Sequence, residues 1–306
     1  MSTSVRVLVI KLGALGDVIQ ALGPMRAIRA HHPEAHITIL TGKAFTGLLE
    51  KTGLFNEIWV DKKPKWFDAP AWVGLIQKFN AGRFDRVYDL QNNDRTFFYW
   101  HLFQPKPEWV GAAPGASHRN ADKNRSIGHA FHGHVQTLAI GGVQGVRPDD
   151  LSWMKADLSG LGLKKPYVIL VPGSAPQHTG KRWPHFMALA GQLKAQGVQP
   201  ILIGTKDEAD VIDAIIRDVS GAVSLVGRTQ LWDLPELARQ SDGVIGNDTG
   251  PMHLMGPTNA KTVVLMGPKS NPKRHYPLGD KVTIIHNENL AAISVDQALA
   301  ALASLT

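Results

Sequence analysis

Cysteine is absent from this chain of 306 residues. Its absence excludes disulfide bonds, thiolate nucleophiles and metal centres held by cysteine, and it fits a reducing compartment. No apolar run approaches the roughly 18 to 20 residues that a membrane-spanning helix needs. The first residues also lack the charged start and apolar core of a secretory signal peptide. We therefore expect a cytoplasmic globular protein, since 43% of the residues are hydrophobic and 19% are charged.

Acidic residues are the minority among the charged ones, with 26 Asp and Glu against 33 Lys and Arg and a formal net charge of +7. Such a balance favours an anionic partner, which can be a nucleotide, a phosphorylated glycan, an acidic membrane surface or a nucleic acid. Solubility alone explains the balance equally well. The basic residues are scattered and no known nucleic-acid-binding module is visible, so we predict no nucleic-acid partner.

The dinucleotide-binding fingerprint G-x-G-x-x-G is missing from the start of the chain, which disfavours an NAD-dependent dehydrogenase. The apolar run at 5–10 predicts a buried strand, and KLGALGD at 11–17 then leads into apolar residues at helical spacing. Asp17 is therefore expected at or near a helix N-cap, at the carboxyl edge of the predicted sheet. It can be a simple cap, or a functional carboxylate placed where ligands of such folds bind.

Strands alternate with helical stretches along the whole chain, which is the pattern of βα units with parallel sheets. Strands are expected at 36–41, 57–60 and 85–90, and after a restart at 167–171, 200–203, 223–226 and 262–266. The stretch 148–166 between the two series is interpreted as a linker. The sequence thus predicts an α/β protein with two successive βα domains, residues 1–155 and 156–306, and a ligand-binding cleft between them.

Three stretches carry weaker signals. The stretch 59–72 is rich in Lys and Trp, which suits a membrane surface or an acceptor loop, although such aromatic residues can also pack under a loop. The stretch 92–127 is interpreted as less regular, and its polar residues 92–95, together with Arg119, Lys123 and Arg125, are candidates for binding a sugar or phosphate acceptor. The histidines at 129, 132 and 134 have no carboxylate at a ligand spacing, so we predict no metal site.

The loop PGSAPQHTGKRWP at 172–184 differs from the phosphate-binding motif G-x-x-x-x-G-K-[ST]. Too many residues separate Gly173 from Gly180, and Arg182 stands where Ser or Thr would hold magnesium. What remains is a turn with Gly and Ser, followed by Lys181 and Arg182. These cations suit a diphosphate that is bound without a metal, or they form a solvated pair with no ligand.

The sequence GVIGNDTGPMH at 243–253 predicts a strand that runs into a helix. The first turn of a helix has unpaired N–H groups and the positive end of the helix dipole, so it is a favourable place for phosphate. Thr249 adds a hydroxyl group, and Gly250 lets a ligand approach the backbone. Asp, Thr and Pro are also ordinary residues of a helix start, so a purely structural role remains open.

Taken in order, KLGALGD, PGS with KRWP, LIGTKDE and NDTGPMH resemble the motifs of glycosyltransferase family 9, the ADP-heptose:lipopolysaccharide heptosyltransferases. The resemblance spans essentially the whole chain, and NDTGPMH is its most specific part. It implies the GT-B architecture, in which two Rossmann-like domains face each other across a cleft. In such enzymes the first domain binds mainly the acceptor, and the second binds mainly the sugar nucleotide.

The resemblance also implies roles for particular residues. Asp17 matches the catalytic carboxylate, Lys181 the lysine that faces phosphate, and Glu208 the acidic residue that binds ribose. The residues expected to bind the donor nucleotide and its diphosphate are Ser174, Lys181, Glu208, Asp248, Thr249, Gly250 and His253. Two departures stand out: the residues after His253 should break the following helix early, and Gly13 and Ala14 replace a pair of serines.

The function that follows from this resemblance is an inverting glycosyltransferase that needs neither a metal nor another cofactor. It would move a sugar, expected to be heptose from ADP-heptose, onto an acceptor of the lipopolysaccharide-core type. Asp17 would act as the base, while Lys181 and the helix start would stabilise the leaving diphosphate. The expected partners are the nucleotide-sugar donor and an anionic glycolipid, with peripheral contact at the inner membrane. The alternative is a non-catalytic protein of the same fold that binds a sugar nucleotide or glycan, which the broken helix favours.

Overall fold

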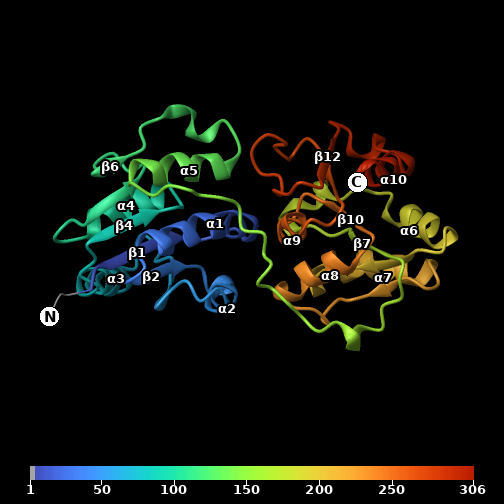
Figure 1. Ribbon diagram of the computed structural model, residues 1–306, viewed down its shortest axis with the longest axis horizontal. Coiled ribbons are helices and arrows are strands. Elements are labelled where there is room, and N and C mark those ends of the chain that lie inside the picture. The colour runs from blue at the N-terminus through green and yellow to red at the C-terminus, as the bar shows by residue number, and fades with distance from the viewer. Residues whose placement is uncertain (1–3) are drawn as a thin grey trace. The chain divides into compact units, whose positions relative to one another are not determined.

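The structure is a computed structural model that describes residues 4–306, and it divides into two compact units, Met1–Pro148 and Asp149–Thr306. Each unit contains a six-stranded parallel sheet with helices packed along it (Figure 1). The predicted α/β class is confirmed. Among the described residues, no helix combines the length and apolar character needed to cross a bilayer.

The sheet of the first unit has the strand order β3-β2-β1-β4-β5-β6. Its strands are β1 (Arg6–Lys11), β2 (His36–Thr41), β3 (Glu57–Val60), β4 (Arg86–Asp89), β5 (Glu108–Gly111) and β6 (His118–Arg119). Its helices are α1 (Leu15–His31), α2 (Thr46–Lys51), α3 (Ala69–Ala81), α4 (Asp94–Leu102) and α5 (Ala130–Ile140). The chain runs outward from β1 to one edge and then restarts at β4, so the order reverses between these two strands.

The sheet of the second unit repeats this topology with the order β12-β11-β10-β7-β8-β9. Its strands are β7 (Tyr167–Val171), β8 (Gln199–Leu202), β9 (Val223–Ser224), β10 (Gly243–Asn247), β11 (Thr262–Met266) and β12 (Val282–His286). Its helices are α6 (Phe186–Ala195), α7 (Ala209–Asp218), α8 (Leu234–Gln240), α9 (Gly250–Met255) and α10 (Val295–Ser304). Here the order reverses between β7 and β10.

The strands predicted at 36–41, 57–60 and 262–266 have the predicted bounds. The stretch 92–127, interpreted as less regular, contains α4, β5 and β6, for which no bounds were predicted. The start of α4 is fixed by a reciprocal cap, in which the side chains of Asn93 and Thr96 each accept a hydrogen bond from the other's backbone N–H. This local cap was available in the sequence, but the dense aromatic residues of α4 hid the helical period.

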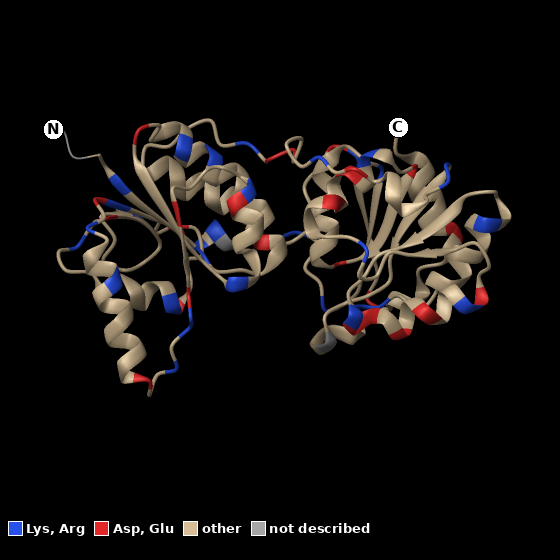
Figure 2. Ribbon diagram, turned by 90° about the horizontal axis from the view of Figure 1, so that it is seen from below, with Lys and Arg blue, Asp and Glu red and all other residues tan. Residues whose placement is uncertain are grey.

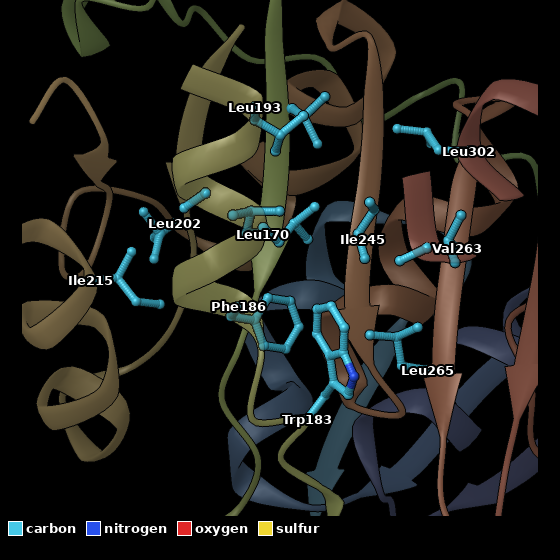
Figure 3. Packing of buried hydrophobic residues seen from close by; sticks show 14 of the residues in the cluster. Leu170, Trp183, Phe186, Leu193, Leu202, Ile215, Ile245, Val263, Leu265 and Leu302 are labelled. Atoms are coloured by element: carbon cyan, nitrogen blue, oxygen red, sulfur yellow. The ribbon is translucent and has the colours of Figure 1, made fainter. Parts of the chain in front are cut away.

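Strand β7 shows why the central strands are continuous apolar runs. Val168 and Leu170 pack in one cluster with α6, α7 and α10, which includes Trp183 and Phe186 (Figure 3). Tyr167 lies on the opposite face of the sheet, where its hydroxyl donates to the Leu237 carbonyl of α8 at 3.1 Å. Because helices cover both faces, every residue of β7 is buried.

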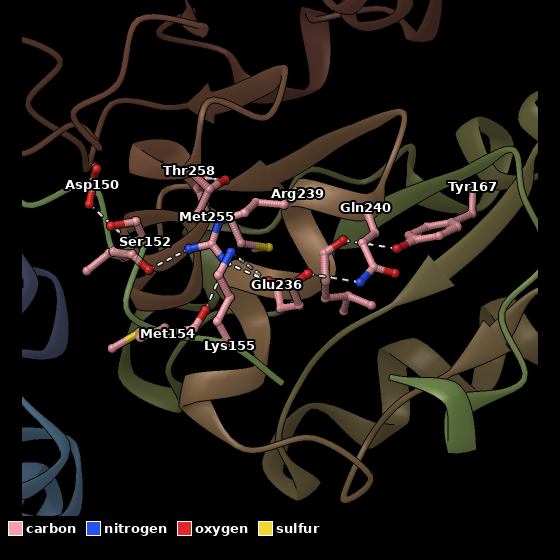
Figure 4. A network of polar contacts seen from close by, with 12 residues as sticks. Asp150, Ser152, Met154, Lys155, Tyr167, Glu236, Arg239, Gln240, Met255 and Thr258 are labelled. Atoms are coloured by element: carbon pink, nitrogen blue, oxygen red, sulfur yellow. Dashed lines mark hydrogen bonds and ion pairs between the residues drawn. The ribbon is translucent and has the colours of Figure 1, made fainter. Parts of the chain in front are cut away.

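The residues that follow the first unit are tied to α8 by one half-buried cluster of polar contacts (Figure 4). The guanidinium of Arg239 donates to the carbonyl oxygens of Leu151 and Met154 and to Glu236. Gln240 donates to the second oxygen of Glu236 at 2.9 Å, and this bond, together with Arg239, lowers the pKa of Glu236. These contacts tie residues 149–155 to the second unit. The boundary between the two units therefore lies at 148/149, earlier than the predicted boundary after residue 155.

Replacement of Arg239 should reveal how much this cluster stabilises the second unit. The Arg239→Lys variant keeps the charge but loses the planar fork that reaches two carbonyls, so we expect a loss of about 2 to 4 kcal/mol in the free energy of unfolding. Urea unfolding measures the loss, and hydrogen exchange of residues 149–155 locates it. Arg228→Lys is the matched control, because Arg228 also donates to two carbonyls but at an exposed position. Equal losses in the two variants would contradict this assignment.

Candidate active site

The carboxyl ends of parallel strands meet at one edge of a sheet, and ligands of such folds bind where the strand order reverses. In the second unit, this point lies between the loop that follows β7 and the loop that follows β10. The register pairs Gly246 of β10 with Val171 of β7 and Asn247 with Leu265 of β11. The predicted motifs at 172–184 and 247–253 are therefore neighbours at the same edge.

Asn247 is the residue that joins these two loops. Its fully buried side-chain amide donates to the carbonyls of Pro172 at 2.8 Å and Gly173 at 3.2 Å, and its Oδ1 accepts from the Trp183 backbone N–H at 3.0 Å. Both ends of the loop after β7 are thus fixed to the last residue of β10. The indole N–H of Trp183 donates to the Ile293 carbonyl at 2.9 Å, which anchors the loop further.

Asp248, the residue after Asn247, holds a cation at the point where the strand order reverses. Lys181 Nζ lies 2.6 Å from Asp248 Oδ2, and the Ser270 hydroxyl donates to the same oxygen at 2.7 Å. The side chains of Lys181 and Asp248 are 19% and 9% exposed, so the pair is largely shielded while the ammonium still reaches the surface. The structure therefore brings together two of the predicted site residues, Lys181 and Asp248. It adds Ser270 from the loop after β11, a residue that the sequence motifs did not indicate.

Thr249 and the short helix that follows form one side of this edge. The Thr249 hydroxyl is buried and has no hydrogen-bond partner among the described residues. Gly246 is required because a Cβ there would lie 2.4 Å from Met252 Sδ, so the helix packs directly on the strand. Gly250 is the first residue of α9, and His253 is buried within it. The predicted early end of the helix is confirmed, because α9 stops at Met255 and a 3-10 turn follows.

The remaining predicted donor residues have local partners. Ser174 is buried, and its hydroxyl donates to the His178 carbonyl at 3.0 Å and accepts from Arg182 at 3.3 Å. Glu208 Oε2 accepts from the backbone N–H of Thr205 at 2.7 Å. Its carboxylate lies against Gly173, where a Cβ would come within 2.1 Å of Oε1. Glu208 is thus positioned at the same sheet edge as Lys181, while Ser174 stabilises the loop.

The first unit has the corresponding site between the loops after β1 and β4. Lys11 is buried and donates from Nζ to the Leu90 carbonyl at 3.1 Å, and the Leu12 backbone N–H donates to Gln91 Oε1 at 2.9 Å. Asp17 is the third residue of α1 and its Oδ2 accepts from the Ala14 N–H at 3.2 Å. The carboxylate therefore caps the helix start, as its sequence position suggested, and lies at the carboxyl edge of the sheet.

Two buried ionisable groups lie beneath this edge. Burial raises the pKa of Asp89 to about 6, although the N–H groups of Asn92 and Gln91 and the nearby Lys11 oppose the shift. Burial likewise lowers the pKa of Lys11, against the attraction of Asp17 and Asp89. One oxygen of Asp89, Oδ2, has no hydrogen-bond partner among the described residues. The ammonium of Lys11 is thus the cation that both carboxylates share.

A pocket of about 390 Å³ opens just before α1, where Ala14 lines it together with two cations, Lys63 and Arg95. Both are positioned by one buried carboxylate. Asp61 Oδ1 accepts from the Lys63 backbone N–H at 2.8 Å, and both Asp61 oxygens accept from the Tyr99 hydroxyl. Tyr99 in turn accepts from Arg95 at 3.0 Å. The pocket also includes Asn93, so two of the polar residues predicted to grip an acceptor line it.

The histidines near 130 have a structural place. His129 is the N-cap of α5, where its Nδ1 accepts from the Phe131 N–H at 3.2 Å, and His134 is buried in the same helix. Within residues 4–306, no group of three or more His, Asp or Glu side chains is arranged to hold a metal ion.

The comparisons with known proteins agree on one family. A sequence model of glycosyltransferase family 9 (heptosyltransferase) matches residues 127–301. Lipooligosaccharide heptosyltransferase 2 of Haemophilus influenzae is 35% identical over 129 residues, which cover 40% of this chain and 37% of that protein. Lipopolysaccharide heptosyltransferase 2 of Escherichia coli is 24% identical, with 92% of this chain and 87% of that protein covered.

The fold also resembles that of a solved heptosyltransferase structure. The solved structure of the ADP-heptose lipopolysaccharide heptosyltransferase II of E. coli superposes with a TM-score of 0.75 at 22% identity, and 98% of each chain is covered. The predicted family resemblance and the GT-B fold class are thus confirmed.

The raised pKa of Asp89 predicts a defined pH dependence of stability. A carboxyl whose pKa rises on folding stabilises the fold below its unfolded pKa, near 4, and this contribution is lost as the pH rises through about 6. The difference in unfolding free energy between wild type and Asp89→Asn should therefore fall by about 2 to 3 kcal/mol between pH 4 and pH 7. Urea unfolding at a series of pH values measures it. A difference that stays constant over this range would show that the Asp89 pKa is not raised.

Proposed function

This chain belongs to glycosyltransferase family 9, and on that premise we propose that it transfers heptose from ADP-heptose to an acceptor of the lipopolysaccharide-core type. The transfer proceeds with inversion at the anomeric carbon and without a divalent metal. The observation that carries the proposal is the Lys181 ammonium, fixed at 2.6 Å from Asp248 at the strand-order reversal of the second unit. A positive group fixed in advance at this place suits the diphosphate of a nucleotide sugar.

On the donor side, the chemistry is stabilisation of the leaving group. Breaking the bond between the anomeric carbon and the diphosphate oxygen leaves negative charge on ADP. Lys181 and the Thr249 hydroxyl supply donors for this charge, and Asp248 and Ser270 keep the lysine in place. One preorganised donor of this kind contributes about 3 to 4 kcal/mol to the transition state. Gly250 and His253 complete the diphosphate site, Ser174 supports the loop, and Glu208 binds the ribose.

On the acceptor side, Asp17 takes the proton of the attacking hydroxyl. The hydroxyl oxygen forms the new bond to the anomeric carbon while the old bond to the diphosphate breaks, so the configuration inverts. Lys11 lies within electrostatic reach of Asp17. The pocket with Lys63 and Arg95 is also lined by Ala14, whose N–H donates to this carboxylate, and it suits an anionic acceptor. Such a glycolipid would be met at the cytoplasmic face of the inner membrane, which makes this a cytoplasmic enzyme with peripheral membrane contact.

Exchange of one carboxyl oxygen tests this proposal. Asp17→Asn should lower kcat by about 10² to 10⁴-fold, which is the usual contribution of a positioned base, while ADP affinity is retained. The assay supplies ADP-heptose and heptose-deficient lipopolysaccharide with EDTA present, and NMR of the product reads the anomeric configuration. Asp296→Asn is the control, because Asp296 also lies in the first turn of a helix.

The outcomes separate the alternatives. Full activity of Asp17→Asn would remove Asp17 from the mechanism, and activity that depends on added metal would overturn metal independence. The early end of α9 at Met255 favours a second candidate, a non-catalytic binder of the same ligands. Binding of ADP-heptose by the wild type, without transfer to any acceptor offered, would support that candidate.

A further inference from the structure

Several large apolar side chains of the first unit are exposed in the segment that leads into α3 and on α3 and α4. Trp66 is 87% exposed and Phe67 is 64% exposed, in the segment that leads from β3 into α3. Val73 on α3 and Phe98 on α4 are also exposed. We call these four residues the aromatic tip. Exposed apolar side chains that gather in this way mark a surface that binds a partner.

The aromatic tip is built on an ordered turn. The Lys65 carbonyl accepts from the Asp68 N–H and from the indole N–H of Trp72, both at 2.9 Å. Asp68 then caps α3 by accepting from the Ala71 N–H at 3.2 Å. Trp72 packs edge-on against Phe98 with ring centroids 5.1 Å apart, so α3 is packed on α4, and the rings of Trp66 and Phe67 lie edge-on at 5.6 Å. These local bonds keep the rings of the tip at the surface.

The charge around the tip is positive. Lys62, Lys63 and Lys65 are all exposed, and Figure 2 shows blue segments along the stretch that leads into α3. Of the acidic residues in the segment 61–68, Asp61 is buried against Tyr99 and Asp68 caps the helix. The segment 62–67 thus offers two aromatic rings and three lysines close together in the sequence.

We infer that the aromatic tip docks this chain on a lipid bilayer that contains anionic lipids. Trp66 and Phe67 enter the boundary between headgroups and acyl chains, and the lysines contact the lipid phosphates. A bilayer supplies both the apolar layer and the negative charge that this surface matches. A second copy of the chain would bring the same lysines against one another, which is unfavourable. The inference rests on the proposed function in one respect, because a glycolipid acceptor would require the protein to dock on a bilayer.

The absence of cysteine makes a site-specific test simple. The Phe67→Cys variant, labelled with the polarity-sensitive dye NBD, is mixed with vesicles of phosphatidylcholine containing about one third phosphatidylglycerol. We expect a blue shift of the emission and quenching by nitroxide carried on the lipid chains. The control is Ile127→Cys with the same label, because Ile127 is 67% exposed in the same unit but outside the tip. Equal signals at both positions, or none at position 67, would overturn the inference.

Vesicle sedimentation of the unlabelled chain gives the second readout. Trp66→Ser combined with Phe67→Ser should lower the partition coefficient by at least about tenfold, because each ring contributes through the apolar area that it buries in the bilayer. Lys62→Glu with Lys65→Glu should lower it on anionic vesicles and remove its dependence on salt. Met187→Ser, an exposed apolar residue on α6, should leave it unchanged. A blue shift that appears without vesicles and grows with protein concentration would instead assign the tip to self-association.

Failure of this inference can be told from failure of the proposed function. If the tip does not bind lipid, vesicle binding is absent while transfer to a detergent-dispersed acceptor persists. If the proposed function is wrong, transfer is absent with the dispersed acceptor while vesicle binding persists. The tip variants are also tested for ADP binding, which should be unchanged because the residues lie in the first unit.

Discussion

The buried amide of Asn247 is the contact on which the candidate donor site depends. It satisfies two carbonyls and one N–H of the loop after β7, so that loop cannot move without leaving polar groups unpaired in the interior. Lys181 belongs to the loop that is held in this way, and Asp248 follows Asn247 directly. The position of the ammonium is therefore fixed through the backbone on both sides before any ligand arrives, which is what electrostatic preorganisation requires.

The first unit uses buried anions for the same purpose. Asp61 accepts the Tyr99 hydroxyl and the Lys63 N–H, and through them it orients the two cations of the pocket. Asp89 attracts the ammonium of Lys11 and accepts hydrogen bonds from backbone N–H groups of the loop after β4. Carboxylates in the interior thus help to position basic groups at the sheet edge. Part of the net positive charge of the chain is in this way concentrated at the two candidate sites.

Much of the fold could be predicted from the sequence, because a strand covered on both faces must be apolar at every position. The runs that became β7 and β11 have this property, and the helical stretches between successive strands indicated parallel βα units. Helix α4 was not predicted, since its aromatic residues are distributed around the helix and obscure the period. The early end of α9 was predicted, because Gly256 and Pro257 are local signals.

The candidate site could be predicted only in part. The motif residues Lys181 and Asp248 were identified, but their pairing joins positions 67 residues apart and depends on the order of the strands. Ser270 follows β11 and has no motif of its own, so only the register of the sheet brings it to Asp248. The pocket with Lys63 and Arg95 likewise depends on Asp61, whose buried contacts no local pattern reveals.

The central claim is that the ammonium of Lys181 binds the diphosphate of the donor. Calorimetric titration with ADP in the presence of EDTA tests it directly, with the Lys181→Met variant compared with wild type and with Lys206→Met, an exposed lysine after β8. Loss of a charge-assisted contact should weaken ADP binding by about tenfold or more in Lys181→Met, while Lys206→Met stays near wild type. Equal ADP affinity in all three proteins would contradict the account.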